Sequence, residues 1–121
     1  MLRLRERIDL LPPSDRLLVE LVMSGAVSRK RAAELLGVEP GTVTRRLRRI
    51  SARLHDPIVR ELMMDRCPLA ADYRQIGVEH FLTGLSAEKL GHRHGIRASE
   101  VRRMLQFVRG WCRGRAGVSR R

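Results

Sequence analysis

Aromatic residues are scarce in this sequence of 121 residues, where they make up only 3%. Long hydrophobic runs are absent too, and none approaches the roughly 20 apolar residues that a membrane-spanning helix needs. Runs of β-branched residues, which strands favour, are also few. A core built mainly from aliphatic side chains at helical spacing is typical of helices, so the sequence predicts an all-α fold.

Cysteines number only two, Cys67 and Cys112, and they form no CxxC pair. Charged residues interrupt the first ten positions, so no signal peptide is expected there. We therefore expect a soluble cytoplasmic protein whose two thiols stay reduced. Each cysteine is interpreted as a small, buried apolar residue.

Motifs of metal sites and of catalysis are also missing. His92 and His94 form a His-x-His pair, but a helix turns the two rings to different faces, and His80 adds no ligand spacing. Serine, histidine and aspartate all occur, yet no nucleophile motif frames them. The sequence therefore predicts no metal site, no cofactor, no catalytic residue and no enzymatic activity.

Acidic residues are outnumbered, since 13 Asp and Glu face 25 Lys and Arg, which gives a formal charge of +12. A charge of this size repels itself in the folded state and favours a polyanionic partner. Nucleic acid is the leading candidate, and an anionic membrane surface is the second. Residues 40–55 are the extreme case, because they contain five arginines and neither Asp nor Glu.

A helix start is predicted at "LPPSDR", residues 11–16. The prolines end any helix that precedes them, and Ser14 can cap the first turn of the helix that follows. Residues 1–10 alternate apolar and charged positions, a pattern that fits either a short helix or an arm.

Two further helices around a turn are predicted between residues 28 and 54. Ser28 is suited to cap the first helix, and Gly37 is suited to end it in a left-handed conformation. Pro40 fits the first turn of the second helix. The core-facing stripe of that second helix consists of Val43, Leu47, Ile50 and Leu54.

Residues of the first half of the sequence recur in the second half at one constant offset, the distance from Leu11 to Leu69. They fall on helix caps, turn glycines and core positions, which predicts a structural duplication. The identical pairs are Leu11/Leu69, Arg16/Arg74, Ser28/Ser86, Gly37/Gly95, Val43/Val101, Arg45/Arg103 and Leu47/Leu105.

The predicted architecture is therefore two tandem helix-turn-helix units of three helices each, joined by a short helical linker. The units cover residues 1–57 and 69–113, and the linker covers residues 58–68. The last segment, residues 114–121, is rich in glycine and arginine and is predicted to be a basic disordered tail.

In each copy a small residue, a turn glycine and a core valine follow one another at the spacing that a helix-turn-helix needs. The small residue lets two helices cross closely, the glycine takes a positive φ, and the valine anchors the second helix in the core. The outer face of that helix is then free to enter a major groove about 12 Å wide. The predicted recognition helices are residues 40–54 and 98–112, and the spaced residues are Ala33, Gly37 and Val43, then Gly91, Gly95 and Val101.

Residues 11–54 resemble region 4 of bacterial sigma-70-type factors. The resemblance is carried by "LPPSDR", by "AAELLGV" as a support helix and by "GTVTRRLRRISARL" as a recognition helix. The close resemblance covers about a third of the chain. A looser resemblance covers most of the chain if the second copy is included. In that family the recognition helix enters the major groove of the promoter −35 element. The resemblance thus implies a nucleoid-associated, DNA-binding protein of a bacterium or phage.

Carried over from the family, the segment from Glu39 to Arg46 would approach bases, while Arg48, Arg49 and Arg53 would approach phosphates. The support helix is unusually basic at its start. In the first unit the candidate DNA-binding residues are Arg29, Lys30, Glu39, Gly41, Thr42, Thr44, Arg45, Arg46, Arg48, Arg49 and Arg53. In the second unit they are Arg97, Ser99, Glu100, Arg102, Arg103, Gln106 and Arg109.

Several hypotheses stay open at this point. The first is a transcriptional regulator that reads double-stranded DNA with both units. The second is an interaction module that docks on RNA polymerase or another regulator, which Glu100 in the second recognition helix favours. The third is the DNA-binding part of a recombinase or phage packaging system. A complete sigma factor is not expected, because the aromatics that promoter melting would use are lacking.

Overall fold

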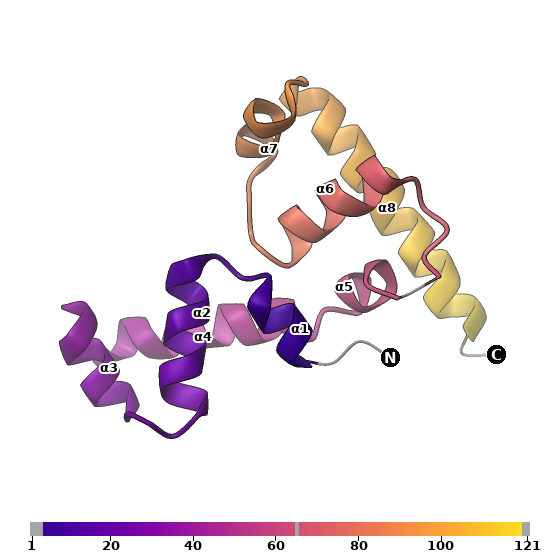
Figure 1. The fold of residues 1–121 in the computed structure, drawn as a ribbon. Helices are drawn as coiled ribbons and strands as arrows, with labels where there is room; N and C mark the ends of the chain where they lie inside the picture. The colour runs from indigo at the N-terminus through magenta and orange to yellow at the C-terminus, as the bar shows by residue number, and fades with distance from the viewer. Residues whose placement is uncertain (1–3, 65, 120–121) are drawn as a thin grey trace. The chain divides into compact units, whose positions relative to one another are not determined.

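The computed structural model describes residues 4–64 and 66–119, with side chains through residue 114 (Figure 1). These described residues form eight helices and no strand, so the predicted all-α fold is confirmed. The chain divides into two compact units at the boundary between Leu54 and His55. We call helices α1 to α4 the N-terminal unit and helices α5 to α8 the C-terminal unit.

The N-terminal unit consists of α1 (Leu4–Asp9), α2 (Pro13–Met23), α3 (Arg29–Leu36) and α4 (Pro40–Leu54). The guanidinium Nη1 of Arg7 donates a hydrogen bond of 2.5 Å to the carbonyl of Leu54, which ties α1 to the end of α4. Buried side chains from all four helices and from the connection between α1 and α2 form the core: Ile8, Leu11, Leu18, Val19, Ala32, Ala33, Val43, Ile50 and Leu54.

The C-terminal unit consists of α5 (Pro57–Leu62), α6 (Ala71–Phe81), α7 (Ala87–His94) and α8 (Ala98–Ser119). Helix α5 lies in the segment for which the sequence predicts a linker, yet it packs against α6 and α8 within this unit. Its carbonyl at Leu62 accepts a 2.7 Å hydrogen bond from Arg74 Nε. The core consists of Val59, Leu62, Ile76, Phe81, Leu82, Leu90, Val101, Met104, Leu105, Val108 and Cys112.

Helix α8 is longer than the sequence predicts. It continues to Ser119, whereas a disordered tail was expected from residue 114 onward. Residues 120 and 121 of that predicted tail lie outside the described residues. A glycine costs only about 1 kcal/mol in a helix, so Gly110 and Gly114 do not suffice to end one.

The predicted caps are confirmed in both units, with one exception. Ser28 Oγ accepts a hydrogen bond from the Arg31 amide, and Gly37 is left-handed at φ 69°. The equivalent Ser86 and Gly95 behave in the same way. Ser14, however, is not a cap, because α2 begins at Pro13 and has no side-chain cap. Proline is already suited to the first turn, so the serine is displaced into the helix.

Backbone hydrogen bonds recur at the offset that the sequence landmarks predict. The Val38 amide donates to the Ala33 carbonyl at 3.0 Å, and the Ile96 amide donates to the Gly91 carbonyl at 3.0 Å. Before each capped helix, Val27 donates to Leu21 at 3.2 Å and Leu85 donates to Glu79 at 3.1 Å. Two residues separated by this offset are called equivalent below.

Candidate nucleic-acid interface

The turn between α3 and α4 positions α4 against the core of the N-terminal unit. Ala33 and Val43 are buried where the two helices meet, as the predicted spacing required. Gly37 ends α3 in the left-handed conformation, which a residue with a side chain would adopt only under strain. Because Val43, Ile50 and Leu54 face the core, the opposite side of α4 faces outward.

The outward side of α4 is basic. Arg45, Arg48 and Arg49 lie on it with Gly41, and none of the three arginines is buried. Arg45 Nη2 donates a 3.2 Å hydrogen bond to Thr42 Oγ1, which holds its guanidinium along the helix surface. Among the ion pairs of the described residues, none involves these three arginines. Their charge is therefore available to an anionic partner.

Two other arginines of α4 face the protein itself. Arg46 Nη2 lies 3.4 Å from Asp15 Oδ1, and Arg53 Nη1 lies 3.9 Å from Asp15 Oδ2. Asp15 belongs to α2, and its side chain is only 18% exposed. The Asp15 cluster, which comprises these three residues, therefore joins α2 to α4. The sequence led us to assign Arg46 and Arg53 to DNA contact and did not single out Asp15.

We expect Asp15→Ala to destabilise the N-terminal unit by about 1 kcal/mol, because the ion pairs are partly shielded from water. The same change would strengthen binding to random duplex DNA at low salt, since it removes a negative charge beside α4. Urea unfolding followed by far-ultraviolet circular dichroism would measure the first effect. A double-mutant cycle with Arg46→Ala should give a coupling energy above about 0.5 kcal/mol, and additive single effects would contradict the assignment.

The start of α3 is basic as well. Arg29 and Lys30 are exposed in its first turn, which contains no acidic residue. Arg31 instead pairs with Glu34 at 3.0 Å. Cations are unfavourable at a helix N-terminus, where the backbone amides already present partial positive charge. An anion bound there would relieve this repulsion.

The remaining candidates of the N-terminal unit lie at the start of α4. Glu39 is exposed, and its carbonyl accepts the amide of Thr42 at 3.0 Å in the first turn. Thr42 and Thr44 are half-buried on either side of the outward face. The structure thus brings Gly41, Thr42, Arg45, Arg48 and Arg49 together on one surface of α4.

The equivalent side of α8 differs in charge. Arg102 forms an ion pair with Glu88 of α7, and Arg103 forms one with Glu100 in its own helix. The hydrogen bond and the charge of Glu100 raise the pKa of Arg103 further above its ordinary value, so the guanidinium stays protonated. Arg109 lies 5.4 Å above the ring of Phe81. The other candidates of this unit are Arg97, Ser99 and Gln106, and none of them is buried.

Aromatic side chains occupy the flank between α6 and α8, at positions where the N-terminal unit is charged. Tyr73 of α6 meets Phe107 of α8 edge to face, with ring centroids 5.3 Å apart. The equivalent residues are Asp15 and Arg49. The sequence did not lead us to select either aromatic residue as functional. Their helical positions alone do not distinguish an exposed ring from a buried one.

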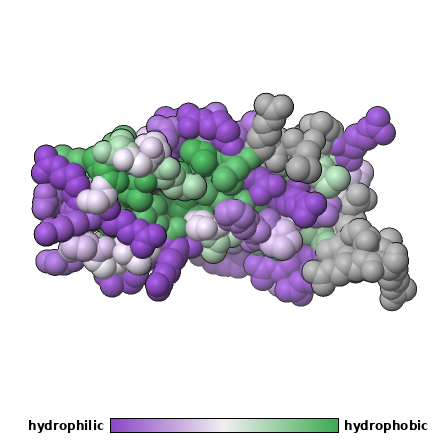
Figure 2. Space-filling view, turned by 90° about the horizontal axis from the view of Figure 1, so that it is seen from below, coloured by the Kyte–Doolittle hydropathy of each residue, from purple (hydrophilic) through white to green (hydrophobic). Residues whose placement is uncertain are grey.

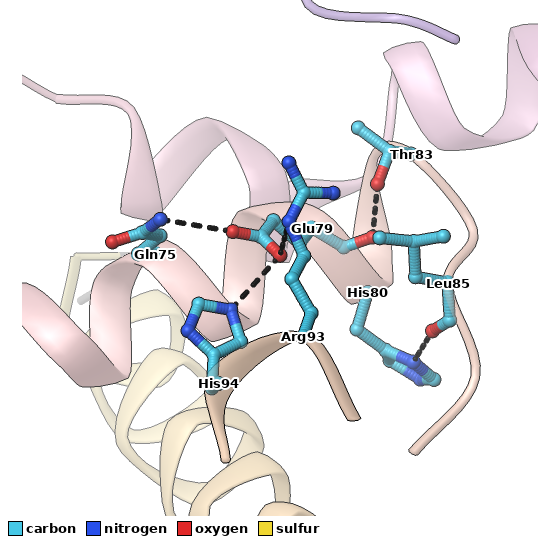
Figure 3. Close-up of polar contacts among 7 residues, drawn as sticks. All are labelled: Gln75, Glu79, His80, Thr83, Leu85, Arg93 and His94. Carbon is cyan, nitrogen blue, oxygen red and sulfur yellow. Dashed lines mark hydrogen bonds and ion pairs between the residues drawn. The ribbon is translucent and has the colours of Figure 1, made fainter. Parts of the chain in front are cut away.

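A polar network joins α6 to α7 in the C-terminal unit (Figure 3). The buried Glu79 accepts from Gln75 Nε2 at 3.0 Å, and its Oε2 lies 3.1 Å from His94 Nε2 and 3.6 Å from Arg93 Nε. His80 Nδ1 contacts the Leu85 carbonyl at 2.8 Å. His80 and His94 therefore make contacts within the C-terminal unit itself.

The N-terminal unit exposes leucines where this polar network stands in the C-terminal unit. Leu17, Leu35 and Leu36 are exposed on α2 and α3, and their equivalents are Gln75, Arg93 and His94. Figure 2 shows one face on which hydrophobic surface is bordered by hydrophilic side chains. An exposed hydrophobic surface with a polar border is typical of a protein contact.

Comparison with known protein families decides the character of the N-terminal unit. Residues 1–54 match the family model for sigma-70, region 4. The N-terminal unit is a sigma-70 region 4 helix-turn-helix domain. The matched segment ends with α4, so the family model does not extend to the C-terminal unit. No curated protein and no solved structure matches the chain.

Within this region 4 domain, α3 and α4 are the two helices on either side of the turn at Gly37. Domains of this kind bind DNA in sigma factors or regulators and are typically non-catalytic. Among the described residues, no helix has both the length and the apolar character needed to cross a membrane. No cluster of three or more potential metal ligands occurs in the described part of the chain.

Proposed function

We propose that this protein is a transcriptional regulator that reads a specific sequence in double-stranded DNA, with α4 in a major groove. The observation that carries the proposal is the outward face of the region 4 recognition helix. There Arg45, Arg48 and Arg49 have no acidic partner among the described residues. An α-helix fits the major groove, which is about 12 Å wide.

The chemistry of this face suits DNA. Arginine donates two parallel hydrogen bonds to O6 and N7 of guanine, or to the oxygens of a phosphate. Thr42 holds Arg45 in place through a 3.2 Å hydrogen bond, which reduces the rotamer freedom that binding would otherwise remove. The N-terminal half of α4 would therefore approach base edges.

The start of α3 supports the same proposal. Arg29 and Lys30 lie in a first turn without acidic residues, where their charges repel the helix dipole. A DNA phosphate at this position would accept hydrogen bonds from the backbone amides and from the cationic side chains together. These two residues would then position the domain on the backbone without reading sequence.

We also propose that the C-terminal unit is a second, divergent helix-turn-helix unit. The equivalent caps, the left-handed glycines and the repeated backbone hydrogen bonds support this proposal. Residues 98–112 of α8 would be its recognition helix. If it also reads DNA, the two units would contact major grooves about one helical turn, or about 34 Å, apart. The carboxylates of Glu88 and Glu100 reduce the charge available for this contact.

Selection from a random duplex library at about 150 mM salt tests both proposals. We expect an enriched motif that Arg45 specifies. A bipartite motif with half-sites about 10 base pairs apart would assign base reading to both units. A single half-site would restrict reading to α4. Selection without any enriched motif would refute sequence-specific binding by this chain.

A second candidate function is docking on RNA polymerase or another regulator through the N-terminal unit. The exposed leucines at positions 17, 35 and 36 favour it, because the same positions are polar in the C-terminal unit. If this function holds, Leu35→Gln weakens polymerase binding while duplex DNA binding is unchanged. Loss of DNA binding alone upon Arg45→Ala, with polymerase binding intact, would separate the two functions.

A further inference from the structure

An aromatic patch on the C-terminal unit has no structural counterpart in the N-terminal unit. Phe107 is 56% exposed although it is a large apolar side chain. Its ring stands edge to face with Tyr73, at an interplanar angle of 76°. We call Tyr73 and Phe107, with the half-buried Trp111 one turn further along α8, the aromatic patch.

The equivalent positions of the N-terminal unit carry charged residues instead of aromatic ones. Their equivalents are Asp15, Arg49 and Arg53, and the N-terminal unit folds on the same backbone hydrogen bonds with charges there. The core of the C-terminal unit lies on the other side of α8, at Val101, Leu105 and Val108. Three of the four aromatic residues of the chain thus lie on a flank that packing leaves partly open.

The surface of α8 beside Phe107 carries two glycines, which have no side chain. Gly110 and Gly114 follow it by about one and two helical turns, so they share its side of α8. A Cβ atom added at either glycine would meet nothing within 4 Å. A partner backbone can therefore approach α8 closely along these glycines while its side chains reach the aromatic rings.

Charge decides which partner fits. Exposed arginines border the open surface, with Arg103 beside Phe107 and Arg113 on the other side of Gly110. A second copy of this chain would bring its own charge of +12 and be repelled. Nucleic acid would place phosphates near Glu100 and Asp72, which have the same sign as the phosphates. A protein segment offers apolar anchors together with individually placed carboxylates.

We propose that the aromatic patch is a docking site for an acidic, amphipathic helix of a partner protein. Leucines or other apolar residues at helical spacing would cover Phe107 and Tyr73. Glutamates or aspartates beside them would pair with the exposed Arg113 and would share Arg103 with Glu100. This docking site and the DNA-reading face of α4 belong to different units, so the protein would connect a promoter to a second protein.

A library of displayed helical peptides, randomised at the apolar positions and flanked by glutamates, provides the probe. A matched library carries lysines in place of the glutamates. We expect enrichment from the glutamate library only. Phe107→Arg should lower the affinity of the protein for the selected peptides at least 10-fold. Arginine already stands at the equivalent position 49, so the fold accommodates it.

Two further variants separate docking from folding. Gly110→Gln fills open space and favours the helix, so it should raise the stability of the protein. The same change should lower its affinity for the peptide at least 10-fold. Leu35→Arg is the matched control, because Leu35 is equally exposed, at 56%, on the other unit. Peptide affinity should be unchanged in this control, because Leu35 belongs to the N-terminal unit.

Each of the following outcomes would overturn the proposal. Equal enrichment from the lysine library would refute the role of charge, and no enrichment from either would refute docking. Unchanged affinity in both patch variants would place the peptide elsewhere. Binding of a single-stranded oligonucleotide that Phe107→Arg abolishes, or a dimer that the same change dissociates in sedimentation, would assign the patch to nucleic acid or to a second copy.

Discussion

Replacing Arg45 and Arg49 together by alanine should lower affinity for the selected duplex by about 100-fold or more. Each good arginine contact with a guanine edge contributes about 1–3 kcal/mol of discrimination, and phosphate contacts add to this. Both guanidiniums lie on the outward face of α4, and neither forms an ion pair among the described residues. Fluorescence anisotropy with the selected duplex, at several salt concentrations, would measure the loss.

The matched control removes the same charge elsewhere. Arg60 and Arg66 are exposed in the C-terminal unit, and neither belongs to a recognition helix. Their double alanine variant should lose only a few-fold affinity, through the long-range field that falls with salt. Equal losses in the two double variants would show that net charge alone explains binding. Arg46 is unsuitable for this test, because its replacement also breaks the Asp15 cluster.

Gly91→Val should destabilise the C-terminal unit by about 3 kcal/mol, at the upper end of what overpacking costs. A Cβ atom at this position would lie 2.7 Å from the Ile96 carbonyl oxygen and 3.3 Å from the Ala98 amide nitrogen. Both are backbone atoms of the turn, which cannot rotate away as a side chain would. The turn and the start of α8 would have to move.

Trp111 makes this effect measurable in one unit alone, because it is the only tryptophan and belongs to α8. Urea unfolding followed by its fluorescence should show a lower midpoint for Gly91→Val. The control is Gly110→Val, which introduces the same side chain into open space on the same unit. It should leave stability unchanged or raise it by a few tenths of a kcal/mol. Similar midpoints for the two variants would contradict the close approach at Gly91.

Local features of this chain could be predicted from the sequence. Ser28 and Gly37 act on residues three to five positions away, so their neighbours in sequence determine their roles. The buried stripe of α8, from Val101 to Cys112, follows from helical periodicity for the same reason. The region 4 character of the N-terminal unit was likewise predictable, because its motifs lie within one continuous segment.

Features that depend on contacts between distant residues could not be predicted. Arg46 and Asp15 are far apart in the sequence, and nothing in either helix alone indicates that the pair forms. Glu79 and His94 meet only because α6 packs against α7, which leaves the imidazole half-buried beside the carboxylate. Which candidate residues touch DNA stays a prediction for the same reason.

The repeated backbone frame has a consequence for how this protein could change. The same backbone hydrogen bonds form at equivalent positions within each unit, although leucines, an aspartate and arginines of one unit correspond to polar and aromatic residues of the other. Caps and turns therefore maintain the architecture, while the outer side chains determine what each unit can bind. A transplant of the outer residues of α4 onto α8 should yield a second reader without refolding, and natural variation could remodel one exterior while selection preserves the other.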